Sequence, residues 1–195
     1  MLHSSRAGHV QAHLGARTNT HSSVWNTCLP CPLSDLQAQW LPLPGSLTRA
    51  LRALGAFHLE VLHEGCAHPN PDEAQALGIG TDSQCWLREV LMSVDGTHAV
   101  IGRSLTPDIP DAHAWRDIRT LSDTPLGVLL YEDPRITRTP FEYARPGQGQ
   151  PLAELAGQVG LLLARRSVFR VQQEPLLVAE CFLPGLWEIA GRRRP

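Results

Sequence analysis

The sequence contains no lysine, so its basic residues are all arginines. Schiff-base chemistry through a lysine amine is therefore excluded. Long apolar runs are also missing: none approaches the roughly 20 residues of a membrane span, and no apolar signal segment follows the first residues. These absences predict a soluble, cytoplasmic protein that does not insert into membranes.

Charge of either sign is nearly balanced, with a formal net charge of -2. A protein that binds the nucleic-acid backbone usually has a strong basic excess, so nucleic acid is not an expected partner.

The cysteines do not show the spacing of a disulfide framework, because they are odd in number and irregularly placed: Cys28, Cys31, Cys66, Cys85 and Cys181. This pattern fits a reducing compartment.

Metal, cofactor and nucleophile motifs are missing. Cys28 and Cys31 form a C-x-x-C pair, but no second pair or spaced histidine completes a zinc site, and no βαβ pattern surrounds it. There is no G-x-S-x-G elbow, phosphate-binding loop or H-E-x-x-H motif. We therefore expect no metal and no cofactor.

The 195 residues suit one domain with extensions. Residues 1–32 contain no Asp or Glu and no apolar periodicity, which predicts a disordered N-terminal extension; a transit peptide or a start codon placed too far upstream would look the same. Residues 33–187 form the predicted domain. Residues 188–195, with three consecutive arginines, are expected to be a charged tail.

Helical and strand patterns alternate along the domain without βαβ order, which predicts a single α+β domain built on an antiparallel sheet. Ser34 and Ser46 are expected to cap two short helices, the second ending at Gly55. The other expected elements are helical pieces at 72–77, near 115, after 125 and at 152–163, and strands at 57–63, 86–94, 97–107, 166–171 and 176–183.

The segment 86–107 is predicted to form a β-hairpin, because two β-favouring runs flank Asp95-Gly96. This dipeptide is typical of a two-residue type I′ turn. Such a turn places Arg88 directly opposite Arg103. Because alternate side chains share a face, both arginines then lie on an otherwise apolar surface.

Two interpretations of these arginines compete. Facing like charges destabilise a sheet, and a buried charge costs several kcal/mol unless it is paired. An internal carboxylate could neutralise them, or a shifted register could expose that face to solvent. Alternatively, they bind a ligand with two carboxylates or phosphates, which guanidinium groups recognise in bidentate geometry. The hairpin alone leaves these possibilities open.

Glu180 is the second unusual residue. In the predicted strand 176–183 both faces are apolar, which indicates a central, buried strand, and Glu180 is its charged residue. A buried carboxylate either pairs with a cation, here Arg166 or a hairpin arginine, or takes up a proton. In the functional interpretation Glu180 is the polar end of a pocket whose cationic end is Arg88 with Arg103.

Ordered blocks from about residue 46 to 184 resemble the bacterial chorismate lyase family: WLREVLM, DG, IGRSLTP, TPLG, ITRTPFEYAR, ARRSVF and PLLVAECFLP. Enzymes of this family convert chorismate to 4-hydroxybenzoate and pyruvate, the first committed step of ubiquinone synthesis. The resemblance implies a cofactor-independent lyase with two helical flaps over an internal site. Its expected partner is the small-molecule substrate chorismate, and we expect a monomer.

The resemblance also implies roles for individual residues. Arg88 matches the arginine that holds the ring carboxylate, and Glu180 matches the glutamate that contacts the ring hydroxyl; both are expected to be catalytic. Arg103 matches a second arginine, which we assign to the enolpyruvyl carboxylate and the developing pyruvate enolate. Leu126 matches a position whose backbone contacts the ligand, and Leu47 occupies the flap position where the enterobacterial form has Met.

Two alternatives remain at this point. The effector-binding domains of some bacterial transcription regulators share the implied fold and would also use arginines to bind a ligand. Those regulators have an N-terminal helix-turn-helix, which residues 1–32 do not resemble. The other alternative is a different enzyme that uses chorismate.

Overall fold

A seven-stranded antiparallel sheet forms the centre of the computed structural model, which describes residues 24–108, 114–122, 124–157 and 161–192. The strand order is β1-β2-β3-β7-β6-β4, and β5 also pairs with β6. The strands are β1 (Phe57–Ala67), β2 (Cys85–Val94), β3 (Thr97–Pro107), β4 (Thr137–Arg138), β5 (Glu142–Ala144), β6 (Leu163–Val171) and β7 (Glu174–Phe182). The predicted α+β class and the central position of β7 are confirmed.

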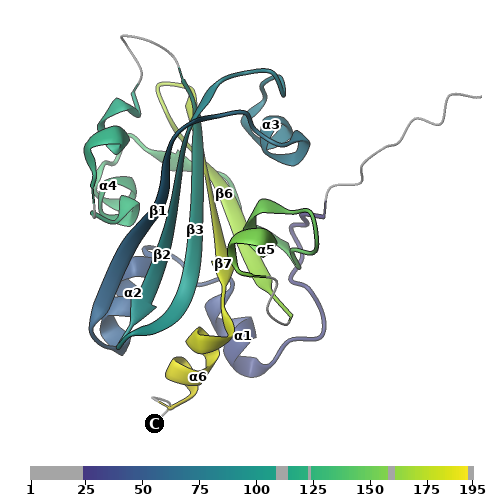
Figure 1. The fold of residues 1–195 in the computed structure, drawn as a ribbon, viewed down its shortest axis with the longest axis vertical. Helices are drawn as coiled ribbons and strands as arrows, with labels where there is room; N and C mark the ends of the chain where they lie inside the picture. The colour runs from purple at the N-terminus through teal and green to yellow at the C-terminus, as the bar shows by residue number, and fades with distance from the viewer. Residues whose placement is uncertain (1–23, 109–113, 123, 158–160, 193–195) are drawn as a thin grey trace, which may run out of the picture.

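Helices cover both faces of the sheet. They are α1 (Asp35–Trp40), α2 (Leu47–Leu54), α3 (Pro71–Leu77), α4 (Leu126–Glu132), α5 (Pro151–Leu155), α6 (Pro184–Arg192) and the 3₁₀ helix η1 (Arg116–Thr120). Figure 1 shows α2 and α4 on one side of the sheet and α3 and α5 on the other. Within the described ranges, no helix has the length and apolar character needed to cross a membrane.

Local capping fixes the first two helices where the sequence predicted them. The Ser34 hydroxyl accepts a hydrogen bond from the Gln37 amide, and the Gln37 side chain accepts one from the Ser34 amide, a complete capping box. At the start of α2 the Ser46 hydroxyl accepts a hydrogen bond from the Arg49 amide. These caps satisfy amide groups that a helix start otherwise leaves unpaired.

The turn between β2 and β3 is the predicted two-residue turn. Asp95 and Gly96 have φ angles of 49° and 75°, as a type I′ turn requires. Val94 pairs with Thr97 on either side of the turn. The Asp95 carboxylate also accepts a hydrogen bond from the Ala56 amide at 2.8 Å, which ties the turn to the end of α2.

The register beyond this turn differs from the prediction, because Ala99 is an extra residue in β3. Ser93 pairs with His98, whereas the next residue along β2, Met92, pairs with Val100. A bulge of one residue moves every following side chain of that strand to the other face. Arg88 is therefore opposite Ser104, and the prediction that it faces Arg103 was wrong.

A second irregularity occurs in β1, where Leu62 is the extra residue. Val61 pairs with Val90, and the next pair is His63 with Glu89. The shift brings Glu64 opposite Arg88. The two bulges thus place Arg88 between a carboxylate on one neighbouring strand and a hydroxyl on the other.

Both ends of the predicted domain extend further than expected. Asn26 exchanges two backbone hydrogen bonds with Tyr143, at 2.9 and 2.7 Å, so residues 24–32 are not a disordered extension. At the other end α6 continues to Arg192 and buries Ile189 and Ala190, so the predicted tail from 188 was also wrong. The expectation for residues 1–23 lies outside the described residues.

The helix predicted for 152–163 is shorter in the structure. It forms α5 and ends at Leu155, and Leu163 already begins β6. Small and apolar residues fit a buried strand as well as a helix, so periodicity alone could not separate the two.

Candidate active site

A cavity of about 60 Å³ lies between the sheet and the helices α2 and α4. Its walls are mainly apolar and include Leu47, Leu59, Val90, Met92, Leu126, Leu130, Phe141, Phe169 and Val178. A cavity that holds benzene measures roughly 150 Å³. The cavity is therefore smaller than one that holds a six-membered ring.

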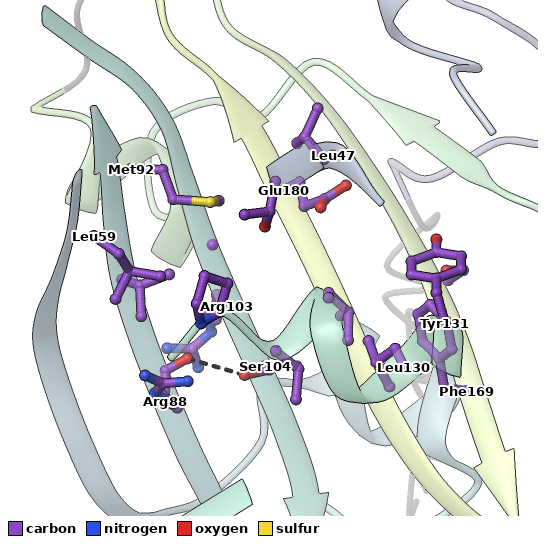
Figure 2. A pocket seen from close by; sticks show the side chains of 18 of the residues that line it. Leu47, Leu59, Arg88, Met92, Arg103, Ser104, Leu130, Tyr131, Phe169 and Glu180 are labelled. Atoms are coloured by element: carbon purple, nitrogen blue, oxygen red, sulfur yellow. Dashed lines mark hydrogen bonds between the residues drawn. The ribbon is translucent and has the colours of Figure 1, made fainter. Parts of the chain in front are cut away.

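Arg88 forms the cationic end of this pocket. Its side chain is 3% exposed and donates hydrogen bonds to the backbone carbonyls of Ser122 and Thr124, the second at 3.2 Å. Its Nε lies 3.9 Å from Oε1 of Glu64. The Ser104 hydroxyl donates to the Arg88 carbonyl, as Figure 2 shows. The guanidinium is thus held between the sheet and the segment that enters α4.

Glu180 forms the acidic end, and its ion-pair partner is Arg165. Nε of Arg165 lies 2.6 Å from Oε2 of Glu180, with the arginine 1% and the glutamate 18% exposed. The partners considered from sequence were Arg166 and the hairpin arginines. Arg166 instead points to the opposite face, where its Nε lies 2.7 Å from Glu142.

Arg103 borders the pocket, but its guanidinium is bound to carboxylates. Nε lies 2.6 Å from Oε1 of Glu73, and a second ion pair joins Arg103 to Glu89. Burial disfavours the charged arginine, but the two glutamates outweigh it and raise the pKa of Arg103. The internal-carboxylate interpretation of the hairpin therefore holds for this arginine.

The pocket thus brings together most of the expected site residues. Four of them line it: Arg88, Glu180, Leu47 and Leu126. Leu47 and Leu126 belong to α2 and α4, the two helices that cover the pocket. In Figure 2, Arg88 lies toward one end on β2 and Glu180 toward the other on β7. Arg103 differs, because its charged group is engaged elsewhere.

Sequence reasoning missed several polar residues of the site. Arg165 was overlooked because the predicted strand began one residue after it. Thr48 and Tyr131 line the pocket from α2 and α4. Burial and the charge of Glu180 raise the pKa of Tyr131, so its phenol stays protonated and can donate a hydrogen bond.

A larger cavity of about 380 Å³ lies on the opposite face, near α3 and α5. Its buried arginine, Arg166, is already paired with Glu142 and lies 4.5 Å from the ring centre of Trp25. This cation is therefore committed to the protein itself. The smaller pocket, with charged groups at two ends of an apolar interior, is the better candidate site.

Metal ligands do not gather in the part of the chain that the structure describes. No group of three or more His, Cys, Asp or Glu side chains there could hold a metal ion. Cys28 and Cys31 are exposed free thiols.

Comparison with known proteins finds a family model and relatives whose names describe the same activity. The family model described as "Chorismate lyase" matches residues 22–192. "Probable chorismate pyruvate-lyase 1" of Pseudomonas entomophila (strain L48) is 46% identical over 176 residues, which cover 88% of this chain and 95% of that protein. "Probable chorismate pyruvate-lyase" of Bordetella pertussis (strain Tohama I) is 42% identical over 173 residues, covering 85% and 91%.

Solved structures with this fold include an effector domain. The effector domain of PhnF from Mycobacterium smegmatis superposes with a TM-score of 0.51 at 18% identity, covering 73% of this chain and 91% of that one. Identity this low supports a shared fold and nothing about activity.

Proposed function

Because this chain belongs to the chorismate lyase family, we propose that it eliminates pyruvate from chorismate to give 4-hydroxybenzoate. One observation supports this most strongly: a buried arginine and a partly buried glutamate face the same apolar pocket from two ends. Chorismate has a carboxylate and a hydroxyl at opposite positions of one ring. The arginine at one end of the pocket suits the substrate carboxylate, and the glutamate at the other end suits the substrate hydroxyl.

The spacing of the two residues suits a single ring. Arg88 and Glu180 are on β2 and β7, separated by β3, and their pairing partners Ser104 and Gly102 are two residues apart. Strand spacing and rise then put the two Cα atoms roughly 12 Å apart. After both side chains extend inward, one six-membered ring with its substituents fits between the charged groups.

We assign the ring carboxylate to Arg88, because a guanidinium binds a carboxylate through two parallel hydrogen bonds. Its donors reach the carbonyls of Ser122 and Thr124. A substrate carboxylate competes with these carbonyls, so binding is coupled to a shift of the segment entering α4. We assign no substrate contact to Arg103, since Glu73 and Glu89 already occupy its guanidinium.

The reaction needs no oxidant or cofactor to balance. The ring–oxygen ether bond breaks, the ring carbon with the hydroxyl loses a proton, and the enolpyruvyl methylene gains one to become the methyl group of pyruvate. Aromatisation drives the elimination, so the protein mainly holds a reactive conformer in a dry cavity. Glu180 receives a charge-assisted hydrogen bond from Arg165, and as an anion it can only accept a hydrogen bond from the substrate hydroxyl.

Two proton routes are compatible with this geometry: transfer through Glu180, or direct transfer within the substrate. Turnover in deuterated water separates them. Complete retention of the ring proton in the pyruvate methyl group indicates direct transfer, whereas solvent deuterium there shows that the proton leaves the substrate. Transfer through Glu180 then also requires that Glu180→Gln slows the elimination.

The assignment is tested by mixing the purified chain with chorismate and following pyruvate and 4-hydroxybenzoate. We expect equal amounts of both products without any added cofactor. The fold shared with a regulator effector domain makes ligand binding without turnover the second candidate. Calorimetric binding of 4-hydroxybenzoate by a chain that does not turn over chorismate would favour that candidate.

We also propose that the working unit is a cytoplasmic monomer. The helices and strands that line the pocket all come from one chain, so a second copy is not needed to complete it. Light scattering after size exclusion measures the mass directly, and a stable dimer would contradict this proposal.

A further inference from the structure

Arg165 lies directly beside Glu180, because the two residues pair in register on β6 and β7. Its side chain is 1% exposed, and its Nε donates to Oε2 of Glu180 at 2.6 Å. This is a charge-assisted hydrogen bond in surroundings from which the protein largely excludes water. Such bonds are short and strong, and the loss of either partner leaves the other charge poorly compensated.

The rest of the Arg165 guanidinium is also fixed. Nη1 donates to the carbonyls of Leu41 and Leu43, at 3.1 and 2.8 Å. The group lies 4.3 Å from the ring centre of Phe141 and 5.6 Å from that of Phe182. These contacts prevent the arginine from turning away from Glu180. They also connect Glu180 to the segment between α1 and α2, and α2 covers the pocket.

We propose that Arg165 is a positioning residue of the site: it keeps the Glu180 carboxylate ionised and oriented for the substrate hydroxyl. A carboxylate that is buried without a cation favours its protonated form, in which it can donate as well as accept hydrogen bonds. Arg165 removes this ambiguity and engages Oε2, so Oε1 is the oxygen best placed to accept from the ligand. The inference rests on the proposed function, because the hydroxyl contact gives the orientation of Glu180 its consequence.

Arg166 provides a matched control in the same strand. It is also buried, at 5% exposed, and its Nε lies 2.7 Å from Glu142, a pair of similar geometry on the opposite face. Replacing either arginine by methionine removes one ion pair between a buried arginine of β6 and a more exposed glutamate, which is 18% exposed for Glu180 and 38% for Glu142. Of the two glutamates, Glu180 lines the pocket and Glu142 does not.

The test compares Arg165→Met and Arg166→Met in chorismate turnover, with thermal unfolding measured for both. We expect Arg165→Met to lower kcat/KM by about ten- to hundredfold, the usual effect of losing one hydrogen bond to a charged group, and Arg166→Met to change it by less than about threefold. The pH profile of Arg165→Met should also differ from that of the wild type, because the Glu180 carboxylate has then lost its cation while the Tyr131 phenol still faces it. Equal losses with an unchanged pH profile would show that Arg165 is only structural.

A second comparison uses Glu180→Gln, which removes the charge that Arg165 compensates. Adding Arg165→Met to Glu180→Gln should lower kcat/KM by less than about threefold, whereas independent roles would give the full loss again. If Arg165→Met does not fold, Arg165→Lys decides, since it keeps the charge and loses the planar fork. We expect folded protein with about tenfold lower kcat/KM, and undiminished activity would overturn the inference.

The proposed function fails separately from this inference. A wild-type chain that binds 4-hydroxybenzoate but does not turn over chorismate would overturn the lyase assignment alone. The same variants would then test Arg165 through ligand affinity, with the Arg165 variant weakened and the Arg166 control unchanged. Active wild-type enzyme with an equally active Arg165→Met variant would overturn the inference alone.

Discussion

Replacing Arg88 by methionine tests the cationic end of the pocket. This guanidinium donates to the backbone carbonyls of Ser122 and Thr124. A substrate carboxylate would add an opposite charge to the same donors. Losing a hydrogen bond to a charged group costs about 1.5–3 kcal/mol, so removal of the guanidinium should weaken transition-state binding by roughly 2–3 kcal/mol.

This difference corresponds to a loss of about 30- to 160-fold in kcat/KM for Arg88→Met. The assay is chorismate turnover followed by 4-hydroxybenzoate absorbance, with circular dichroism to confirm that the variant is folded. Arg88→Lys keeps the charge but not the bidentate geometry, so its loss should be intermediate. A folded Arg88→Met variant with wild-type kcat/KM would refute the assignment of the substrate carboxylate to Arg88.

Arg103→Met is the informative contrast to this variant. It leaves Glu73 and Glu89 buried without their shared cation. Breaking a buried pair in this way usually costs about 3–5 kcal/mol of unfolding free energy. We therefore expect a marked fall in thermal stability with a nearly unchanged KM in the folded fraction. A raised KM with normal stability would restore the substrate contact that the sequence suggested for Arg103.

Other substitutions test the flaps, the C-terminal helix and the thiols. A Cβ at Gly127 in α4 would lie 2.8 Å from the Ser46 hydroxyl that caps α2, so Gly127→Ala should push α4 away from α2 and weaken binding of 4-hydroxybenzoate several-fold. Gly147 has open space around it, so Gly147→Ala should leave this binding unchanged. Ile189→Ala should lower the unfolding free energy by about 2–4 kcal/mol if α6 is packed, and by less than about 0.5 if this segment is a free tail. Burial raises the pKa of Cys85 to about 11 and that of Cys181 to about 12, so both should resist alkylation at pH 8 until the protein unfolds; rapid labelling of the folded protein would contradict their burial.

Features determined by local chemistry could be predicted from the sequence. Ser34 and Ser46 cap helices because their hydroxyls satisfy the first free amides, and this depends on a few neighbouring residues. The turn at Asp95-Gly96 depends on two residues that tolerate positive φ. The strongly apolar pattern around Glu180 likewise indicated a central strand, which β7 is.

Features determined by pairing between distant segments could not be predicted from the sequence. Ala99 has no property that marks it as the extra residue of a bulge, and it is fully buried in the structure. Its insertion nevertheless decides which face Arg103 occupies. The partner of Glu180 had the same difficulty, because Arg165 and Arg166 differ only in the strand register that selects one of them.

Consecutive charged residues in β2 and β6 divide the sheet into two electrostatic faces. Side chains alternate between faces, so in the pairs Arg88-Glu89 and Arg165-Arg166 the first residue faces the pocket and the second faces away from it. On the far face the charges are neutralised within the protein, as the Arg103 cluster shows. On the pocket face Arg88 donates to the backbone of the segment that precedes α4, and Arg165 pairs with Glu180. The bulges in β1 and β3 set this division, so the residues that create the site include two that have no charge.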